Sequence, residues 1–411
     1  MRIYTLEALL MSPRNRNIGQ RHSRRIHALV VGFFVALAVG AAAASSPAVA
    51  ATPSTATNLY VNPVKGSDTA TGSATAPLLT FQAALNRVKP GTVVHLEAGT
   101  YDQNVVTKVA GLASDRIVVE GPSTGTATLF GTGHVLAVKN SYYIFEGFSI
   151  DGQRAVENRE PVSSWPTSIS SMASFKSSIS SIVQNDRLIY IDSGSNTSGV
   201  KDTVIDHMTL TGAGGECVRI RNNATGNTVE NSVIRYCGMA GVAQSGVFTY
   251  HNGEGVYIGT SSKSTGLAGA QDDASAHNTV KNDTISTYGS ECVDVKENAN
   301  HNTLSDSECS QNTEPLADAG SNVELRGYAN TIEGNSISAS AGYGIKIGSD
   351  TAKEDLGRNR IISNTFADLA AGALDDRSVA PSGQTCGNVV SGGTSPGNFT
   401  RIPGWSFACP S

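Results

Sequence analysis

Charged and aromatic side chains recur at the middle position of a short repeated pattern in the second half of the chain. The pattern is apolar–x–apolar, and its middle residues are Arg219, Tyr257, Asp294, Glu324 and Lys346. If these segments stack as neighbouring strands, the middle residues form one column, because alternate strand residues point to opposite faces. Two residues further on, a second column holds three bases: Arg221, Lys296 and Arg326. We expect both columns to face solvent, where paired acids and bases suit the binding and cleavage of an acidic polysaccharide.

β-Elimination at a uronate sugar is the chemistry that these columns fit best. The reaction needs a group that neutralises the C5 carboxylate, a base that takes the C5 proton, and help for the leaving oxygen. Neighbouring strands lie about 4.8 Å apart, so side chains of adjacent coils in one column approach contact distance. Asp294, Glu324 and Glu291 are candidate ligands for Ca²⁺, a hard cation that prefers several oxygen atoms.

The second column supplies the candidate catalytic residues, Lys296 and Arg326. Crowding by Arg221 and Arg326 predicts a lowered pKa for Lys296, which suits a general base. Arg326 would bind the substrate carboxylate through its guanidinium fork, together with Arg221. The remaining residues of the first column are predicted to contact the sugar chain: Arg219, Tyr257 and Lys346.

A structural explanation competes with the catalytic one. Opposite charges stacked on one sheet face form favourable cross-strand pairs and keep an exposed wall soluble. Glutamates also recur two residues before the first apolar residue of the pattern, as turn and ladder residues do: Glu216, Glu254 and Glu291. The alternative function is therefore a non-catalytic polysaccharide-binding or cell-surface protein.

Short strands in a repeated coil must carry these columns. Glu324 and Lys346 are 22 residues apart, and Arg219 and Tyr257 are 38 residues apart. A second motif, Asn-Thr-apolar, recurs as Asn227-Thr228-Val229, Asn278-Thr279-Val280, Asn302-Thr303-Leu304 and Asn330-Thr331-Ile332. Short alternating strands between Gly and Asn turns at such a period predict an all-β fold, a parallel β-helix whose coils share one core. Asn residues at equivalent turns are expected to stack in ladders.

The mature region is predicted to be one domain, residues 51–411. Its parts are an N-terminal cap with the first coils (58–152), a Ser-rich excursion (153–187), the repeat coils (188–375) and a C-terminal cap (376–411). Thr80 is expected to cap a short helix that buries Phe81, Ala84 and Leu85 and covers the open end of the solenoid. Excursions next to the charged columns are candidate cleft walls: 153–187, 239–254, 260–277 and 311–321.

Composition and the N-terminal sequence narrow the function classes. Of 411 residues, 16% are charged and 6% are aromatic, and the formal net charge is −5. That composition suits strands and turns, and the lack of a dominant basic patch argues against nucleic-acid binding. Residues 1–50 have the form of a signal peptide, with an apolar run from Ala28 and an A-x-A site ending at Ala50. We therefore expect a secreted, extracellular, bacterial monomer that is free of the membrane after signal cleavage.

The six cysteines of the mature region predict disulfides, because their number is even and they follow an export signal. Cys217 and Cys292 occupy equivalent positions before the apolar pattern, and Cys237 and Cys309 each follow about one turn of the repeat later. This equivalence favours sequential pairing: Cys217–Cys237, Cys292–Cys309 and Cys386–Cys409. The sequence has no C-x-x-C pair, which argues against a thiolate zinc site.

The chain resembles secreted right-handed parallel β-helix proteins of the pectate-lyase-like superfamily. The resemblance is carried by LYVNP, APLLTFQAALNRVKPGTVVHLEAGTY, GEGVYIGTS, ECVDVKENANHNTL and VELRGYANTIEGNSI. The last segment is also similar to the strand of the catalytic arginine in the alginate lyase and chondroitinase B family, which implies that role for Arg326. The preceding strand of that family is flanked by two glutamates and a lysine; the first falls on Glu291, whereas Val293 and Asn298 replace the others. Lys296, two residues earlier on the same strand parity, would then substitute as the base.

A glycoside hydrolase of the polygalacturonase type is the second alternative. GYGIKIGS is similar to the GHGISIGS element of that family, but Tyr343 stands where the family has a histidine. Asp272-Asp273 falls in a predicted loop, whereas the paired aspartates of the family follow a strand. A lyase therefore remains the favoured function.

Overall fold

The computed structural model describes residues 56–152, 165–168, 171, 174–175, 178, 185–194, 198–239, 253–261, 273–312, 320–348, 357–377, 383–391 and 405–409. These residues belong to one compact unit, Ser54–Ser411. The predicted signal peptide, residues 1–50, and much of the predicted excursion 153–187 lie outside the described residues. Within the described part of the chain, no helix has the length and apolar character needed to cross a membrane.

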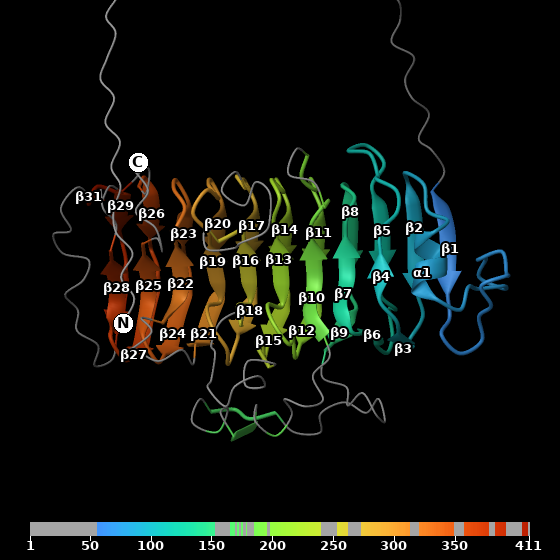
Figure 1. Cartoon of the computed structure of the whole chain (residues 1–411), viewed down its shortest axis with the longest axis horizontal. Helices are drawn as coiled ribbons and strands as arrows, with labels where there is room; N and C mark the ends of the chain where they lie inside the picture. Colours follow the sequence, from blue (N-terminus) through green and yellow to red (C-terminus); the bar gives the residue numbers. More distant parts are fainter. Residues whose placement is uncertain are drawn as a thin grey trace, which may run out of the picture. The chain divides into compact units, whose positions relative to one another are not determined.

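The strands of the described residues form three parallel sheets (Figure 1). Sheet 1 has twelve strands: β1 (Thr57–Val61), β2 (Thr92–Leu96), β5 (Ile117–Glu120), β8 (Tyr143–Glu146), β11 (Val204–Asp206), β14 (Thr228–Glu230), β17 (Thr279–Lys281), β20 (Thr303–Ser305), β23 (Thr331–Glu333), β26 (Asn359–Ile362), β29 (Gly383–Cys386) and β31 (Trp405–Ser406). Sheet 2 has ten strands: β3 (Gly99–Asp102), β6 (Ala127–Phe130), β9 (Ser149–Asp151), β12 (Thr209–Thr211), β15 (Val233–Arg235), β18 (Thr284–Ser286), β21 (Glu308–Asn312), β24 (Ser336–Ser340), β27 (Thr365–Leu369) and β30 (Val389–Ser391). Sheet 3 has nine strands: β4 (Val105–Val106), β7 (Gly133–Val138), β10 (Asn185–Ile191), β13 (Val218–Ile220), β16 (Val256–Ile258), β19 (Val293–Val295), β22 (Ser321–Leu325), β25 (Tyr343–Ile347) and β28 (Gly372–Asp376).

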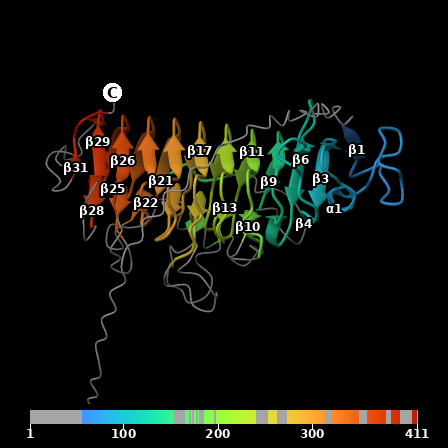
Figure 2. The ribbon, with the colours of Figure 1, turned by 90° about the horizontal axis from the view of Figure 1, so that it is seen from above.

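From β2 to β30 the chain passes through sheets 1, 2 and 3 in turn, and each circuit stacks on the previous one (Figure 2). The fold is therefore a right-handed parallel β-helix, as predicted. Alternate strand residues point inward and form one continuous apolar core, which runs from Leu59 near the first strand to Leu374 in β28. Burying each Val, Ile or Leu side chain contributes roughly 1.5–3 kcal/mol.

The turn from sheet 1 to sheet 2 is the most uniform part of each coil. From β8–β9 to β29–β30 it always has two residues, and the first has a left-handed backbone, with φ between 49° at His207 and 71° at Gly147. From β8 onward, the connections that differ in length are those that enter and leave sheet 3. The longest connections therefore flank sheet 3, as the prediction of cleft walls beside the charged columns requires.

Asparagine ladders run along the stack at two turns. At the first, Nδ2 of Asn227, Asn278 and Asn302 each donates to Oδ1 of the next ladder residue at 2.9–3.1 Å, and the series ends at Asn359. At the second turn, the backbone N–H of each ladder residue donates to a side-chain oxygen of the next ladder residue, one coil further on. The residues of this ladder are, in order, Ser232, Asp283, Ser307, Asn335, Asn364 and Asn388. The ladders satisfy backbone N–H groups that the turns would otherwise leave unpaired. This confirms the predicted stacking.

The predicted N-terminal helix is α1 (Phe81–Leu85), which lies near β1 at the N-terminal end of the stack (Figure 1). Thr80 caps it by accepting a hydrogen bond from the Ala83 amide at 3.1 Å. Phe81, Ala84 and Leu85 are buried, so the helix contributes apolar side chains to the end of the core.

The three predicted disulfides are present: Cys217–Cys237, Cys292–Cys309 and Cys386–Cys409, with Cα–Cα distances of 5.5, 5.8 and 5.3 Å. Two predicted boundaries differ from the structure. β10 begins at Asn185, inside the predicted excursion, and β29, β30 and β31 lie inside the predicted cap 376–411. The coils therefore continue further than predicted, because the last strands have weak alternation and the sequence motif is degraded there.

Candidate functional site

The outward face of sheet 3 carries the predicted first column in register. Direct pairs along neighbouring strands join Tyr190, Arg219, Tyr257, Asp294, Glu324, Lys346 and Asp375. The second column follows two residues later: Asp192, Arg221, Gly259, Lys296, Arg326, Gly348 and Arg377. Three residues before the first column, a further set of charged residues recurs: Arg187, Glu216, Glu254 and Glu291. The apolar–x–apolar spacing thus places charged side chains on one face of one sheet.

The expected exposure of this face is wrong. Asp294 and Lys296 are only 1% and 4% exposed, and Arg219, Tyr257, Arg221 and Glu324 are also buried. Lys346 is partly buried. Ion pairs in such surroundings experience little solvent screening, so each charge on the face depends strongly on its neighbours.

Acids and bases on this face pair both along one strand and with the neighbouring strand. Lys296 Nζ donates to Asp294 Oδ2 on the same strand face. Arg326 donates from Nε and Nη2 to the two carboxylate oxygens of Glu324, at 2.8 and 3.0 Å. Lys346 Nζ lies 2.9 Å from Glu324 Oε1. Burial alone would raise the pKa of Glu324, but Arg326 and Lys346 lower it to about 2.

The predicted lowering of the Lys296 pKa is also wrong. Burial disfavours the ammonium, yet Asp294 outweighs that effect and the repulsion from Arg326, so the pKa of Lys296 is raised. The prediction counted the bases of adjacent coils and overlooked the carboxylate two residues away on the same face. Lys296 is therefore an ammonium group at neutral pH and has no free lone pair with which to take a proton as a general base.

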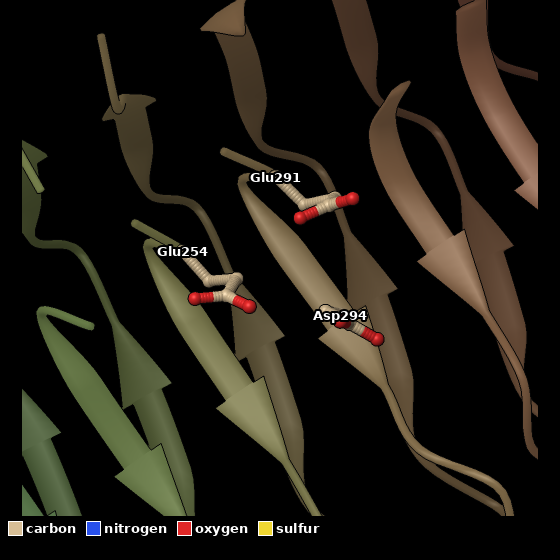
Figure 3. A group of neighbouring side chains, drawn as sticks. All are labelled: Glu254, Glu291 and Asp294. Atoms are coloured by element: carbon tan, nitrogen blue, oxygen red, sulfur yellow. The ribbon is translucent and has the colours of Figure 1, made fainter. Parts of the chain in front are cut away.

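Three buried carboxyl groups converge on sheet 3 (Figure 3), and one of them, Asp294, pairs with Lys296. Glu254, Glu291 and Asp294 each offer one oxygen within 4.8 Å of the others. Within the described residues, Glu254 Oε2 and Asp294 Oδ1 are buried without a hydrogen-bond partner. Burial and Glu216 hold the pKa of Glu254 well above its usual range, and burial, Glu324 and Asp294 raise the pKa of Glu291 to about 7.

The converging carboxyl groups differ from the set that was predicted to bind Ca²⁺. Glu291 and Asp294 were predicted, but Glu324 is not in the cluster, because its oxygens are taken by Arg326 and Lys346. Glu254 takes its place. The recurrence of Glu216, Glu254 and Glu291 was the signal for this residue, since a recurring position in adjacent coils forms a column.

Tyr257 lies between two cations. The Arg219 guanidinium is 3.7 Å from the centre of the ring, and Lys296 Nζ is 4.4 Å from it. Arg219 also donates to Glu216 Oε1 at 2.5 Å. Burial raises the pKa of Tyr257 to about 12 despite both cations, so the phenol keeps its proton at neutral pH.

Gly259 of the second column packs closely against its neighbours. A Cβ atom on Gly259 would lie 3.1 Å from Ala299 Cβ and 3.3 Å from Lys296 Cβ, and Gly259 has a φ of +93°. Gly259 therefore permits a left-handed backbone and close packing on Lys296.

Asp273, predicted to lie in a loop, is buried and accepts hydrogen bonds from the Asn222 and Asn223 amides.

Known proteins share this fold at low sequence identity. Residues 64–121 match a family described as "Protein of unknown function (DUF1565)". The crystal structure of an alginate lyase from Paenibacillus sp. str. FPU-7 is similar, with 19% identity, a TM-score of 0.58, and coverage of 75% of this chain and 91% of that one. Pectate lyase Pel9A is also similar, with 15% identity, a TM-score of 0.54, and coverage of 84% and 79%. No curated protein sequence matches the chain significantly. The chain and these two solved structures therefore share the right-handed parallel β-helix fold.

Proposed function

We propose that this chain is a polysaccharide lyase that cleaves a uronate-containing polysaccharide by β-elimination at the outward face of sheet 3. The observation that carries the proposal is the convergence of Glu254, Glu291 and Asp294 beside Lys296 on one buried face. The two lyases with the same fold support it as analogues. We also propose that the mature chain works outside the cell, which the predicted leader, residues 1–50, supports, and that it works there as a monomer.

We propose Ca²⁺ as the cofactor, because the carboxyl cluster fits it. The cluster offers oxygen donors, and Glu254 Oε2 and Asp294 Oδ1 have no hydrogen-bond partner among the described residues. Two buried carboxylate oxygens without partners are costly unless a proton or a cation satisfies them. When bound there, Ca²⁺ would neutralise the substrate carboxylate and so acidify the C5 proton.

Lys296 stays a proposed catalytic residue, with a changed role. Its ammonium group, held by Asp294, is suited to protonate the leaving oxygen as the C4–O4 bond breaks and the C4–C5 double bond forms. Arg326 has its fork on Glu324, so we propose that it fixes this carboxylate and stabilises negative charge nearby. Arg219, Tyr257 and Lys346 stay proposed substrate contacts.

A product assay tests the proposal. The purified protein is mixed with pectate, alginate and glycosaminoglycans, with Ca²⁺ or with EDTA, and the ultraviolet absorbance of the unsaturated uronyl product is followed. We expect a rise with one polymer that EDTA abolishes and that Lys296→Ala reduces by at least about 100-fold, the usual scale for loss of an acid–base group. Lys281→Ala, which removes a partly exposed lysine paired with Glu230 on sheet 1, is the matched control.

The other outcomes each exclude the lyase. New reducing ends without the absorbance change indicate a hydrolase. Retention on an immobilised polysaccharide without either product indicates a non-catalytic binding protein.

If the absorbance rises, Glu254→Gln, Glu291→Gln and Tyr257→Phe identify the group that takes the C5 proton. Loss of that group stops turnover while polymer binding remains.

A further inference from the structure

Arg221 differs from the other bases of its column in having an unused pair of donors. Its Nη1 donates to the Tyr190 hydroxyl at 3.4 Å, and its Nε lies 3.9 Å from Asp192 Oδ2, which is too long for a hydrogen bond. Among the described residues, Nε and Nη2 of Arg221 are buried and have no hydrogen-bond partner. Oδ1 of Asp192 accepts hydrogen bonds from Asn222 Nδ2 at 2.6 Å and from the Gly194 amide at 2.7 Å, so two neutral donors hold this carboxylate.

The rows of sheet 3 explain why these donors are unused. In three rows, an acid in the first column pairs with the base two residues later: Asp294 with Lys296, Glu324 with Arg326, and Asp375 with Arg377. In the row of β13 the first-column residue is Arg219, which turns to Glu216 in the neighbouring column. Arg221 therefore lacks the carboxylate that its counterparts receive from their own strand.

The hydrogen bonds of Arg326 show which kind of group would pair with the unused donors of Arg221. Glu324 occupies the Nε–Nη2 edge of Arg326 with both of its oxygens. The same edge of Arg221 carries two parallel N–H donors, an arrangement that matches one carboxylate group. Arg221 is only 7% exposed, and a buried guanidinium with unpaired donors is costly.

We propose that the β13 row is a carboxylate subsite, in which the Nε–Nη2 edge of Arg221 binds the carboxylate of a uronate residue. This inference rests on the proposed function for the identity of the sugar. It moves recognition of the substrate carboxylate away from Arg326, whose fork is occupied. The substrate carboxylate takes the place that Glu324 holds in the neighbouring row.

Calorimetry with single sugars tests the subsite without requiring turnover. The full-length mature chain is titrated with galacturonate, glucuronate and guluronate, with neutral galactose and glucose, and with acetate at matched ionic strength. We expect one uronate to bind and its neutral counterpart not to bind. Arg221→Gln should weaken that binding roughly 10- to 100-fold, as loss of a charge-assisted fork does. Arg221→Lys, which keeps the charge without the two parallel donors, should have an affinity for the uronate between those of Arg221→Gln and the wild type. Arg377→Gln, which changes an exposed arginine of the same column, is the control and should bind like the wild type.

Nitrogen-15 spectra of the wild-type arginine side chains provide a measurement that needs no variant. The bound uronate should shift the Nε–H resonance of Arg221 and leave that of Arg326 in place. Equal affinity in Arg221→Gln, an unshifted Arg221 resonance, or no binding by any uronate overturns the subsite. Acetate that binds as tightly as the uronate, with the same dependence on Arg221, overturns the sugar assignment in favour of a small-anion site.

The two proposals fail in distinguishable ways. Uronate binding that depends on Arg221, in a protein that produces no unsaturated product, leaves the subsite standing and removes the lyase. Elimination that proceeds equally well in Arg221→Gln, with unchanged sugar affinity, leaves the lyase standing and removes the subsite.

Discussion

Asp283 is a carboxylic acid at a ladder position where neighbouring coils carry serine or asparagine. Its Oδ1 accepts a hydrogen bond from the Ser232 amide at 2.7 Å, whereas Oδ2 is buried without a hydrogen-bond partner among the described residues. Burial raises the pKa of Asp283 to about 7, although hydrogen bonds from the backbone oppose the shift. The folded state therefore favours the protonated form of the Asp283 carboxyl group.

Asp283→Asn should stabilise the protein above neutral pH. The folded state holds the Asp283 proton more tightly than the unfolded chain, so the wild type loses stability as the pH rises from about 4 to about 7. One pKa unit corresponds to about 1.4 kcal/mol, so a shift from 3.8 to about 7 predicts a loss of about 4 kcal/mol. Urea unfolding at pH 5 and pH 8 should show a larger loss of stability in the wild type and in exposed Asp306→Asn than in Asp283→Asn, which keeps only the contributions of other buried carboxyl groups. Parallel pH dependence in all three proteins would contradict the assignment.

Lys296 and Asp294 form a buried pair whose separate loss should cost more than their joint loss. Lys296→Met leaves the Asp294 charge uncompensated, which predicts a loss of about 3–5 kcal/mol in unfolding free energy. Adding Asp294→Asn should recover much of that loss, because the remaining side chains are neutral. Chemical unfolding measures both, and Lys281→Met, which breaks a partly exposed pair, should cost less than about 1 kcal/mol. Additive losses in the double variant would mean that the two side chains do not interact.

At the scale of the elements, the asparagine ladder connects each coil to the next. Oδ1 of Asn302 accepts from both the amide and Nδ2 of Asn278, and its own Nδ2 donates to the Ser275 carbonyl and to Asn330. Its removal therefore leaves buried backbone groups of neighbouring coils without partners. The hydrogen bonds of the ladder and the apolar contacts of the core therefore both hold each coil in place on the next one.

Asn302→Ala should destabilise the fold by about 1–3 kcal/mol for each buried group that loses its partner. Thr303→Ala, which truncates the neighbouring outward side chain, is the matched control and should change the unfolding free energy much less. Hydrogen exchange should also accelerate at the Asn278 amide in Asn302→Ala. An unaltered exchange rate there would show that another acceptor replaces Asn302.

The strands were predictable because the alternation of apolar residues that marks each one lies within a short segment of the sequence. Alternation of apolar residues fixes which side chains face outward, so the column from Arg219 to Lys346 has the predicted register. Burial of that column was not predictable, since alternation separates two faces and does not say whether another segment covers the outer one. The direction of the Lys296 pKa also failed, because the closest charge, Asp294, lies on its own strand.

At the scale of the whole molecule, cation binding should appear as stability. A ligand that binds only the folded state at 100 times its Kd stabilises it by about 2.7 kcal/mol. We therefore expect a higher Tm in CaCl₂ than in EDTA, and no such difference in Glu254→Gln. Sheet 1 carries a second acidic column, Glu120, Glu146, Asp206 and Glu230, so Glu146→Gln is the control that should keep the response to Ca²⁺. A response lost in Glu146→Gln and kept in Glu254→Gln would move the cation to sheet 1.

The two-residue turn between sheets 1 and 2 has a consequence for how this protein can change over generations. Because that turn keeps one length and one backbone conformation from β8–β9 to β29–β30, an insertion there would displace every ladder partner above it. The borders of sheet 3 already accommodate connections of many lengths. New sequence can therefore be acquired beside the charged face without disturbing the stack, and natural variants should differ most in length where a polymer would be recognised.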